Sequence, residues 1–304
     1  MAEFLKLDLP GTIVPPLTPF RVDLRVDYDA LEGIVNHVVE DCGAAMVIAA
    51  GVEAQEYQFL SFADRKELIA KTIEFVDGRK PVAVGISHPS FRTAIELAEF
   101  AQGKGASALQ LLAPKRPTGG HAKLSELVCY YESVLAETTL PLMLYLNAGP
   151  GSDVSLGDTI TLAQLDRIAY VKESSRDLSR VSRLIEEIEL AGHAHYFTTM
   201  QMYLPTLMLG GSGVTLPTPA AAIARKLTAA FKAGEFKEAA RLQRQFTIWP
   251  SKWMPFGLAA VMKASLNHLG VPSGDPYPPY EPVTGEALEQ IKAYLDTTDL
   301  KKTS

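Results

Sequence analysis

A lysine in the middle of the chain has the setting of a nucleophile. Lys172 ends the apolar run of the segment AYVKESS, and burial at the end of a strand disfavours the charged form of an amine. A neutral amine attacks carbonyl carbon and forms an imine, so this position predicts Schiff-base chemistry. The alternative, that Lys172 pairs with Glu173 or another carboxylate at the rim of the fold, stays open from the sequence.

Tyr145 is the second candidate because it ends another apolar run, LMLYLN. Imine formation requires a group that relays protons to and from the reacting atoms, and a phenol beside a cation can do this. A core tyrosine that donates one hydrogen bond is the alternative. The catalytic interpretation depends on the strands of Tyr145 and Lys172 being neighbours.

Short apolar runs rich in β-branched residues alternate with longer amphipathic segments, and these elements must position the two side chains. The eight runs are residues 12–17, 45–50, 81–86, 108–112, 140–146, 168–171, 195–197 and 213–216. Eight strand-helix units predict an α/β fold, a (β/α)8 TIM barrel whose active site lies at the carboxyl ends of the strands. An open doubly wound sheet is disfavoured because no GxGxxG turn follows the first strand.

The strand pattern stops near residue 225, and helical segments follow at residues 236–248, 253–269 and 284–295. We therefore expect a barrel over residues 1–225 and a C-terminal three-helix domain over residues 226–304. Helices are expected to start at Asp27, Ser61 and Asp177, because each offers a side-chain acceptor just before a segment of helical spacing.

The composition excludes several classes of function. Of 304 residues, 29 are Lys or Arg and 35 are Asp or Glu, a net charge of −6, so the basic surplus typical of nucleic-acid binding is missing. Cys42 and Cys129 are too few for a disulfide framework. His193, His195 and His268 lack ligand spacing, and no metal site is expected. No signal peptide or membrane span is apparent, which predicts a cytoplasmic protein without a membrane partner.

Other polar residues follow the predicted strands. His88 comes after the third strand and is either an acid, base or substrate contact at the barrel mouth or an exposed cap before Pro89. Lys115 and Arg116 follow the fourth strand and suit a carboxylate clamp, although a charged rim is the commoner explanation.

Nearly the whole chain resembles the dihydrodipicolinate synthase and N-acetylneuraminate lyase family. Tyr145 matches the family's tyrosine, and the other matching segments are GTIVPPLTPF, RKPVAVGISHPSFRTAIELAEFAQGKGA, VKESSRDLSRV and LGGSGVTLPTPA. The resemblance implies a barrel with a C-terminal helical domain, an imine of a 2-oxo acid on Lys172, Tyr145 as proton relay, and a homotetramer. Because the imine is itself the electron sink, no cofactor is expected.

The resemblance and the predicted strand ends together define the expected substrate-binding residues. The substrate is expected to be a small 2-oxo acid such as pyruvate or a sugar-acid derivative. The expected contacts are Thr18, Gly51, Val52, Glu53, Glu56, His88, Thr198, Gly213 and Thr215. Within this set, Glu56 is expected mainly to hold its own turn together.

The chain departs from the family pattern where substrates bind. The family's G-T-T-G-E turn reads GVEAQE at residues 51–56, so both threonine hydroxyls are absent and only backbone amides are left to bind a carboxylate. Lys115-Arg116 replaces the tyrosine pair of the synthases, Thr198-Thr199-Met200 replaces an acidic turn, and Pro150 replaces the arginine that holds the second substrate. We therefore predict that this protein does not synthesise dihydrodipicolinate.

Two functions of different classes remain. The leading hypothesis is a lyase acting on a 2-oxo acid, either a retro-aldolase or a dehydratase, with 4-hydroxy-tetrahydrodipicolinate synthase as the alternative that the family name supplies. The other hypothesis is a barrel that has lost turnover and serves in binding or regulation, which only the altered turn at residues 51–56 supports. A homo-oligomer, tetramer or dimer, is expected in either case.

Overall fold

A computed structural model of the chain describes residues 7–53, 56–116, 118, 120–147, 152–246 and 248–300. Among these residues, eight parallel strands close into a barrel in chain order, which confirms the predicted fold. The strands are β1 Gly11–Val14, β2 Met46–Ala49, β3 Val82–Gly85, β4 Ala108–Leu112, β5 Leu142–Leu146, β6 Ile168–Glu173, β7 His195–Thr198 and β8 Gly213–Thr215.

Helices alternate with the strands and then continue alone to the C-terminus. The α-helices are α1 Tyr28–Asn36, α2 Phe62–Val76, α3 Phe91–Gly103, α4 Leu124–Ala136, α5 Leu156–Ala163, α6 Leu178–Leu184, α7 Tyr203–Met208, α8 Thr218–Lys232, α9 Phe236–Arg244, α10 Leu258–His268 and α11 Gly285–Leu295. Shorter 3-10 or π segments are η1 His37–Asp41, η2 Glu56–Phe59, η3 Ile185–Glu189, η4 Met200–Met202 and η5 Ser251–Phe256.

The expected helix starts are confirmed by their hydrogen bonds. Asp27 accepts from the backbone N–H of Ala30, Ser61 from that of Asp64, and Asp177 from those of the first turn of α6. Each side chain satisfies an N–H that has no partner inside its own helix, which sets the residue at which the helix begins.

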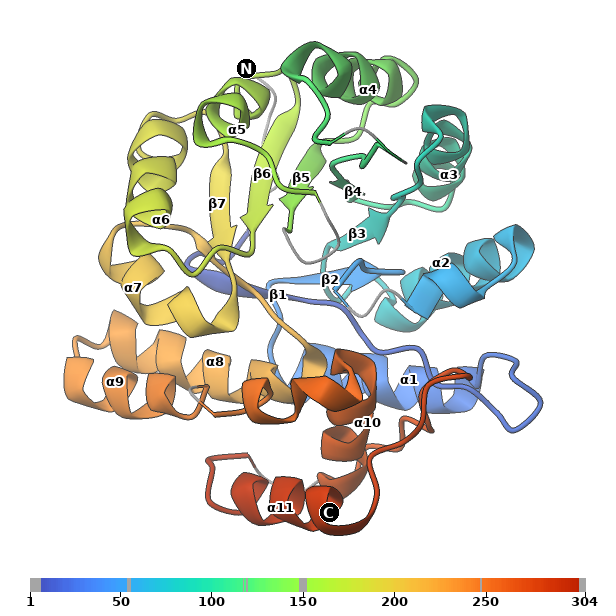
Figure 1. Cartoon of the computed structure of the whole chain (residues 1–304), viewed down its shortest axis with the longest axis vertical. Helices are drawn as coiled ribbons and strands as arrows, with labels where there is room; N and C mark the ends of the chain where they lie inside the picture. The colour runs from blue at the N-terminus through green and yellow to red at the C-terminus, as the bar shows by residue number, and fades with distance from the viewer. Residues whose placement is uncertain are drawn as a thin grey trace. The chain divides into compact units, whose positions relative to one another are not determined.

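The contacts of the chain divide it into two compact units. The first unit comprises two segments, Met1–Gly11 and Pro81–Thr215. The second unit comprises Thr12–Lys80 and Leu216–Ser304. In the first unit, helices α3 to α6 lie around the outside of strands β3 to β7 (Figure 1). All residues of β5 and β6 are buried, as expected for parallel strands that are covered on both faces.

Strand register in the first unit aligns the candidate residues. Tyr145 of β5 lies opposite Lys172 of β6, and Lys172 lies opposite Phe197 of β7. Phe197 in turn lies opposite Gly213 of β8. Because side chains that are opposite one another on adjacent strands point to the same face, these positions share one face of the sheet.

The second unit contains the C-terminal helices. Helix α8 packs along α9, and α10 contacts both α8 and α11 (Figure 1). The expected domain boundary between residues 225 and 226 lies inside α8, because this helix runs on to Lys232. The expected helix over residues 253–269 is split into η5 and α10, since Pro255 interrupts the ladder and Gly257 adopts a φ of 86° that starts a new helix.

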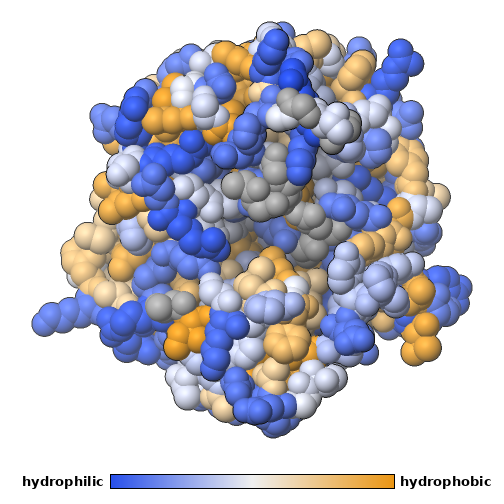
Figure 2. Space-filling view, in the orientation of Figure 1, coloured by the Kyte–Doolittle hydropathy of each residue, from blue (hydrophilic) through white to orange (hydrophobic). Residues whose placement is uncertain are grey.

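The surface is predominantly hydrophilic on the face shown in Figure 2, with hydrophobic residues in separate small groups. Exposed apolar side chains such as Val22, Met208 and Phe236 are scattered along the sequence, which is ordinary for a folded protein. Within the described part of the chain, no helix combines the length and the apolarity that crossing a membrane requires.

Candidate active site

Lys172 is a buried amine on the inner face of the barrel. Its residue exposure is 2%, and its Nζ donates a hydrogen bond of 2.8 Å to the hydroxyl of Ser174. The same Nζ lies 5.1 Å from the centre of the Tyr145 ring. The strand therefore holds the amine away from solvent and beside a phenol, as a Schiff-base nucleophile requires.

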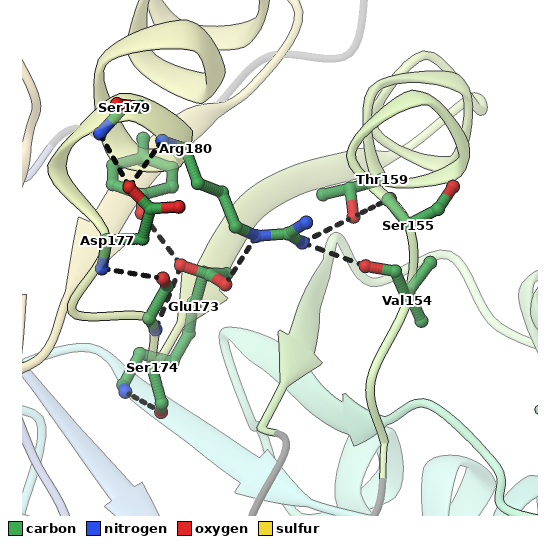
Figure 3. A network of polar contacts seen from close by, with 11 residues as sticks. Val154, Ser155, Thr159, Glu173, Ser174, Asp177, Ser179 and Arg180 are labelled. Carbon is green, nitrogen blue, oxygen red and sulfur yellow. Dashed lines mark hydrogen bonds and ion pairs between the residues drawn. The ribbon is translucent and has the colours of Figure 1, made fainter.

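Glu173 points the opposite way and is not the partner of Lys172. Its carboxylate accepts from Nε of Arg180 at 2.9 Å, from the backbone N–H of Ser175 at 3.0 Å and from the hydroxyl of Tyr196 at 3.2 Å. Figure 3 shows this carboxylate facing Arg180 of helix α6. Because successive residues of a strand alternate between faces, Lys172 faces the barrel interior.

The Arg180 side chain extends this network from one helix to the next. Its guanidinium also donates to the backbone carbonyl of Val154 at 2.9 Å and to the hydroxyl of Thr159 at 3.1 Å (Figure 3). Burial and the adjacent Glu173 carboxylate raise the pKa of Tyr196, so its phenol stays neutral and serves as a donor. The network anchors the strand that carries Lys172.

Tyr145 lies on the neighbouring strand with its side chain on the same face as Lys172. Its residue exposure is 1%, and its hydroxyl accepts a hydrogen bond of 2.9 Å from the side-chain amide of Asn147. The two predicted catalytic residues are therefore adjacent, as the chain order of the strands led us to expect. The strand pairing puts a phenol beside an amine, an arrangement that suits proton exchange with groups attached to that amine.

Thr198 faces away from this pair. It follows Phe197, which is opposite Lys172, so its side chain lies on the face where Tyr196 contacts Glu173. Its residue is fully buried. Strand alternation puts this side chain on the face opposite that of Lys172, and the substrate contact expected for Thr198 stays a prediction.

Gly213 and Thr215 lie on the face of β8 that Phe197 shares. Gly213 has a φ of 154°, and a Cβ there would collide with the backbone carbonyl of Gly11, so only glycine fits. Thr215 is 2% exposed, and its hydroxyl has no hydrogen-bond partner among the described residues. A buried hydroxyl with open hydrogen-bonding capacity suits a polar group of a substrate.

His88 corresponds to the second of the two roles expected for it. The residue is exposed, and its Nδ1 accepts from the backbone N–H of Ser90 at 3.0 Å, immediately before α3. Its backbone carbonyl accepts from the Tyr130 hydroxyl at 2.7 Å. These contacts are those of a turn residue at the start of a helix.

Glu56 hydrogen-bonds the backbone of Thr18 and forms a buried ion pair with Lys263, all within the second unit. Glu56 accepts from the backbone N–H of Thr18 at 2.9 Å and lies 2.7 Å from Nζ of Lys263. Lys263 also donates to the backbone carbonyls of Thr18 at 2.7 Å and of Asp275 at 2.9 Å. Burial raises the pKa of Glu56 and lowers that of Lys263, and their mutual attraction opposes both shifts.

These contacts agree with the structural role expected for Glu56. Both charges are 1–2% exposed, and each hydrogen bond that they make goes to backbone or to one another. The pair ties the Thr18 backbone to η2 and to helix α10. The sequence alone did not predict the role of Lys263, because its partner Glu56 is far away along the chain.

The altered turn retains a glycine for steric reasons. A Cβ on Gly51 would lie 2.6 Å from Cβ of Pro15 and 3.1 Å from Oε2 of Glu53. Val52 is fully buried and Glu53 is half-buried. The Glu53 carboxylate thus lies beside Gly51, where its negative charge opposes a second carboxylate. Residues 54 and 55 lie outside the described residues.

The candidate clamp after the fourth strand is engaged elsewhere. Arg116 forms an ion pair with Glu126 at 2.5 Å, at the start of α4, and lines a cavity of about 350 Å³ together with Lys115 and Asp153. Pro150, which stands in the family's arginine position, lies outside the described residues. Among the residues described, no group of three or more His, Cys, Asp or Glu side chains is arranged to hold a metal ion.

Residues 8–298 match the sequence profile of the Dihydrodipicolinate synthetase family. A curated 4-hydroxy-tetrahydrodipicolinate synthase from Moorella thermoacetica is 28% identical over 291 residues, which cover 93% of this chain and 96% of that protein. The 4-hydroxy-tetrahydrodipicolinate synthase 1 from Halalkalibacterium halodurans is 27% identical over 293 residues, which cover 94% of this chain and 96% of that protein.

Solved structures share the fold. YagE, a prophage protein of the dihydrodipicolinic acid synthase family from E. coli K12 in complex with pyruvate, superposes with a TM-score of 0.86 at 24% identity, covering 95% of this chain and 99% of that one. N-acetylneuraminate lyase from Fusobacterium nucleatum superposes with a TM-score of 0.83 at 18% identity, covering 96% and 99%.

Proposed function

The chain belongs to the dihydrodipicolinate synthetase family, and from this premise we propose that it is a lyase that binds a 2-oxo acid as an imine on Lys172. Tyr145 relays protons in this reaction. The single observation that carries the proposal is the buried amine of Lys172 directly opposite a buried tyrosine on the next strand, with Nζ 5.1 Å from the ring centre.

The reaction follows from these two groups. The neutral amine of Lys172 adds to the C2 carbonyl, and the carbonyl oxygen gains a proton through Tyr145, which gives a carbinolamine. The carbinolamine then loses water and becomes the protonated imine. In an aldol cleavage, the C4 hydroxyl loses its proton and becomes a carbonyl while the electrons of the C3–C4 bond flow into the protonated imine, and the resulting enamine takes up a proton at C3. In a dehydration, removal of the C3 proton gives the enamine, which expels the C4 hydroxyl group; this group takes up a proton and leaves as water. Hydrolysis of the imine then restores the amine, so we propose that the enzyme requires no cofactor.

The substrate class is a small 2-oxo acid, pyruvate or a sugar-acid derivative. Support comes from the fold that the chain shares with a protein solved in complex with pyruvate and with an N-acetylneuraminate lyase. The open hydroxyl of Thr215 suits a substrate oxygen.

Reductive trapping tests the proposal. Pyruvate and borohydride should give a stable adduct on the intact protein, and peptide mass analysis should locate it on Lys172. Lys172→Arg keeps the positive charge but removes the nucleophile, because guanidinium stays protonated. The matched control is Lys104→Arg at an exposed position of the same unit, which should trap like the parent protein. An adduct of equal yield in Lys172→Arg would refute the mechanism.

We also propose a homo-oligomer, tetramer or dimer, located in the cytoplasm. The family resemblance supports the assembly, and the free thiols of Cys42 and Cys129 suit a reducing compartment. Light scattering on the purified chain gives the molar mass directly. A mass equal to one chain, 33.0 kDa, at micromolar concentration would contradict the assembly.

A further inference from the structure

A second tier of polar side chains lies one step beyond the reactive pair. Asn147 is two residues after Tyr145, and Ser174 is two residues after Lys172, so each shares a face with its reactive neighbour. The register pairs Tyr145 with Lys172 and Leu146 with Glu173. If it continues by one residue, Asn147 lies opposite Ser174. Each of them hydrogen-bonds the reactive group of its own strand, at 2.9 Å and 2.8 Å.

The backbone fixes both members of this tier independently of their side chains. Asn147 forms a two-way bridge with Ser152, with N···O distances of 3.3 Å and 3.1 Å. The N–H of Ser174 donates to the carbonyl of Leu146 at 3.2 Å, which continues the ladder between β5 and β6. These backbone contacts fix the position of Asn147, whose side chain donates to the Tyr145 hydroxyl.

We propose that Asn147 and Ser174 are positioning residues that hold the Tyr145 phenol and the Lys172 amine in their reactive orientation. This inference rests on the proposed function. It also assigns a role to two residues that lie outside the site expected from the sequence.

The direction of the Asn147 hydrogen bond determines what the phenol can do. An amide N–H that donates to the phenol oxygen occupies one of its acceptor positions and leaves the O–H to donate elsewhere. The ring is thereby held so that its proton points to a group other than Asn147. A donor on the oxygen also stabilises the phenolate, which eases proton release at the moment when the carbinolamine forms.

Ser174 acts on the amine in a complementary way. Its hydroxyl accepts an N–H of Lys172, which restrains a long side chain that otherwise has several rotatable bonds. The restrained nitrogen lies 5.1 Å from the centre of the Tyr145 ring on the neighbouring strand. The gain is one of orientation, which mainly affects the rate of reaction with the carbonyl.

The rate of deuterium exchange at the methyl group of pyruvate tests the role of Asn147 without a second substrate. Exchange in heavy water, followed by proton NMR, requires imine and enamine formation only, and it yields kcat and KM. Asn147→Leu removes the amide and keeps the size, and it should lower kcat by about two- to tenfold, the range of one net hydrogen bond, with little change in KM. Asn147→Gln retains the donor and should recover part of the rate.

A double-mutant cycle distinguishes positioning from a purely structural effect. If Asn147 acts through the phenol, Asn147→Leu should have no further effect on exchange in a Tyr145→Phe background. An equal fold-loss in both backgrounds would overturn the role of Asn147. The melting temperature of each variant is measured alongside, so that loss of fold is separated from loss of rate.

Ser174 is tested by the rate at which borohydride traps the pyruvate imine. Ser174→Ala should slow trapping by about two- to tenfold, while Ser133→Ala on the exposed face of α4 should not. Trapping of Ser174→Ala at the parent rate overturns its role. If the parent protein itself fails to trap pyruvate on Lys172, the proposed function fails instead, so the two outcomes are distinct.

Discussion

Lys172 and Glu173 are consecutive in the chain but point to opposite faces of their strand. The Glu173 carboxylate is occupied by Arg180, Ser175 and Tyr196 on the other side of the sheet. A carboxylate beside an amine stabilises the ammonium and so weakens the nucleophile. The orientation of Glu173 removes this residue as the partner of Lys172, and the catalytic role of Lys172 stays a prediction.

Replacement of Tyr145 by phenylalanine deletes one hydroxyl from the proposed proton relay. Loss of a general acid-base group costs about 10² to 10⁴ in rate, so pyruvate exchange should fall by that factor with little change in melting temperature. Tyr131→Phe is the matched control, because Tyr131 is also fully buried and its hydroxyl donates to the backbone carbonyl of Leu111. A Tyr145→Phe protein that loses stability but keeps its exchange rate would assign Tyr145 to the core.

The two cysteines should differ sharply in reactivity. Burial raises the pKa of the Cys42 thiol from 9.0 to about 12, whereas Cys129 is exposed. At pH 8 a disulfide reagent should therefore modify one thiol per native chain and two after denaturation, since the thiolate is the reactive form. Because the folded pKa is the higher one, this thiol costs stability only as the pH rises from about 9 toward 12. Rapid modification of two thiols in the native protein contradicts this.

Among the elements, the loops at the strand ends are held by contacts that reach far along the chain. Glu56 and Lys263 bring the Thr18 segment, η2 and α10 together within the second unit. Desolvation makes such a buried pair costly to form, yet each charge relies on the other once it is buried. The pair therefore selects a specific arrangement of these segments more than it adds net stability.

Removal of one charge of this pair should be worse than removal of both. Lys263→Met leaves the Glu56 carboxylate buried and unpaired, and it should lower the free energy of unfolding by about 3–5 kcal/mol. The double variant Glu56→Gln, Lys263→Met should recover part of that loss in urea denaturation. Lys237→Met, at an exposed position of α9, controls for the loss of a lysine. Strictly additive losses in the double variant would show that the two charges are not coupled.

At the scale of the whole molecule, the net charge of −6 repels the anionic substrates that we propose. Local groups must therefore attract a 2-oxo acid, because the overall field opposes its approach. In the proposed reaction, Lys172 binds the first substrate. A second anionic substrate needs a further cation, and Arg116 is paired with Glu126.

We expect the protein to be a poor 4-hydroxy-tetrahydrodipicolinate synthase, despite the names of its relatives. Pro150 supplies neither charge nor side-chain donor for the carboxylate of aspartate semialdehyde, and hydrogen bonds to charged groups contribute roughly 1.5–3 kcal/mol each. A coupled assay with pyruvate and aspartate semialdehyde should give kcat/KM well below about 10⁴ M⁻¹s⁻¹. The same preparation must exchange pyruvate protons, so that an inactive sample is recognised. Condensation with a kcat/KM at or above that value would contradict the prediction and show that the protein has the synthase activity.

The sequence by itself determined the order and type of the elements. Eight strands were expected, and the observed ones lie within or beside the expected runs, because the periods of strands and helices are local properties of the chain. Caps such as Asp27 and Asp177 were equally local. Lys172 and Tyr145 could be paired from the order of the strands alone, since consecutive strands of a barrel are neighbours.

Only the tertiary structure decided which way the side chains point and what they contact. The register of β7 puts the Thr198 side chain on the face opposite that of Lys172, an orientation that the sequence did not predict. Asn147 and Ser174 follow the reactive residues by two, a spacing that alternation could have flagged, yet their hydrogen bonds depend on the exact pairing of β5 with β6. Lys263 reaches Glu56 across most of the chain. Register and long-range contact are properties of the packed chain, and no local pattern encodes them.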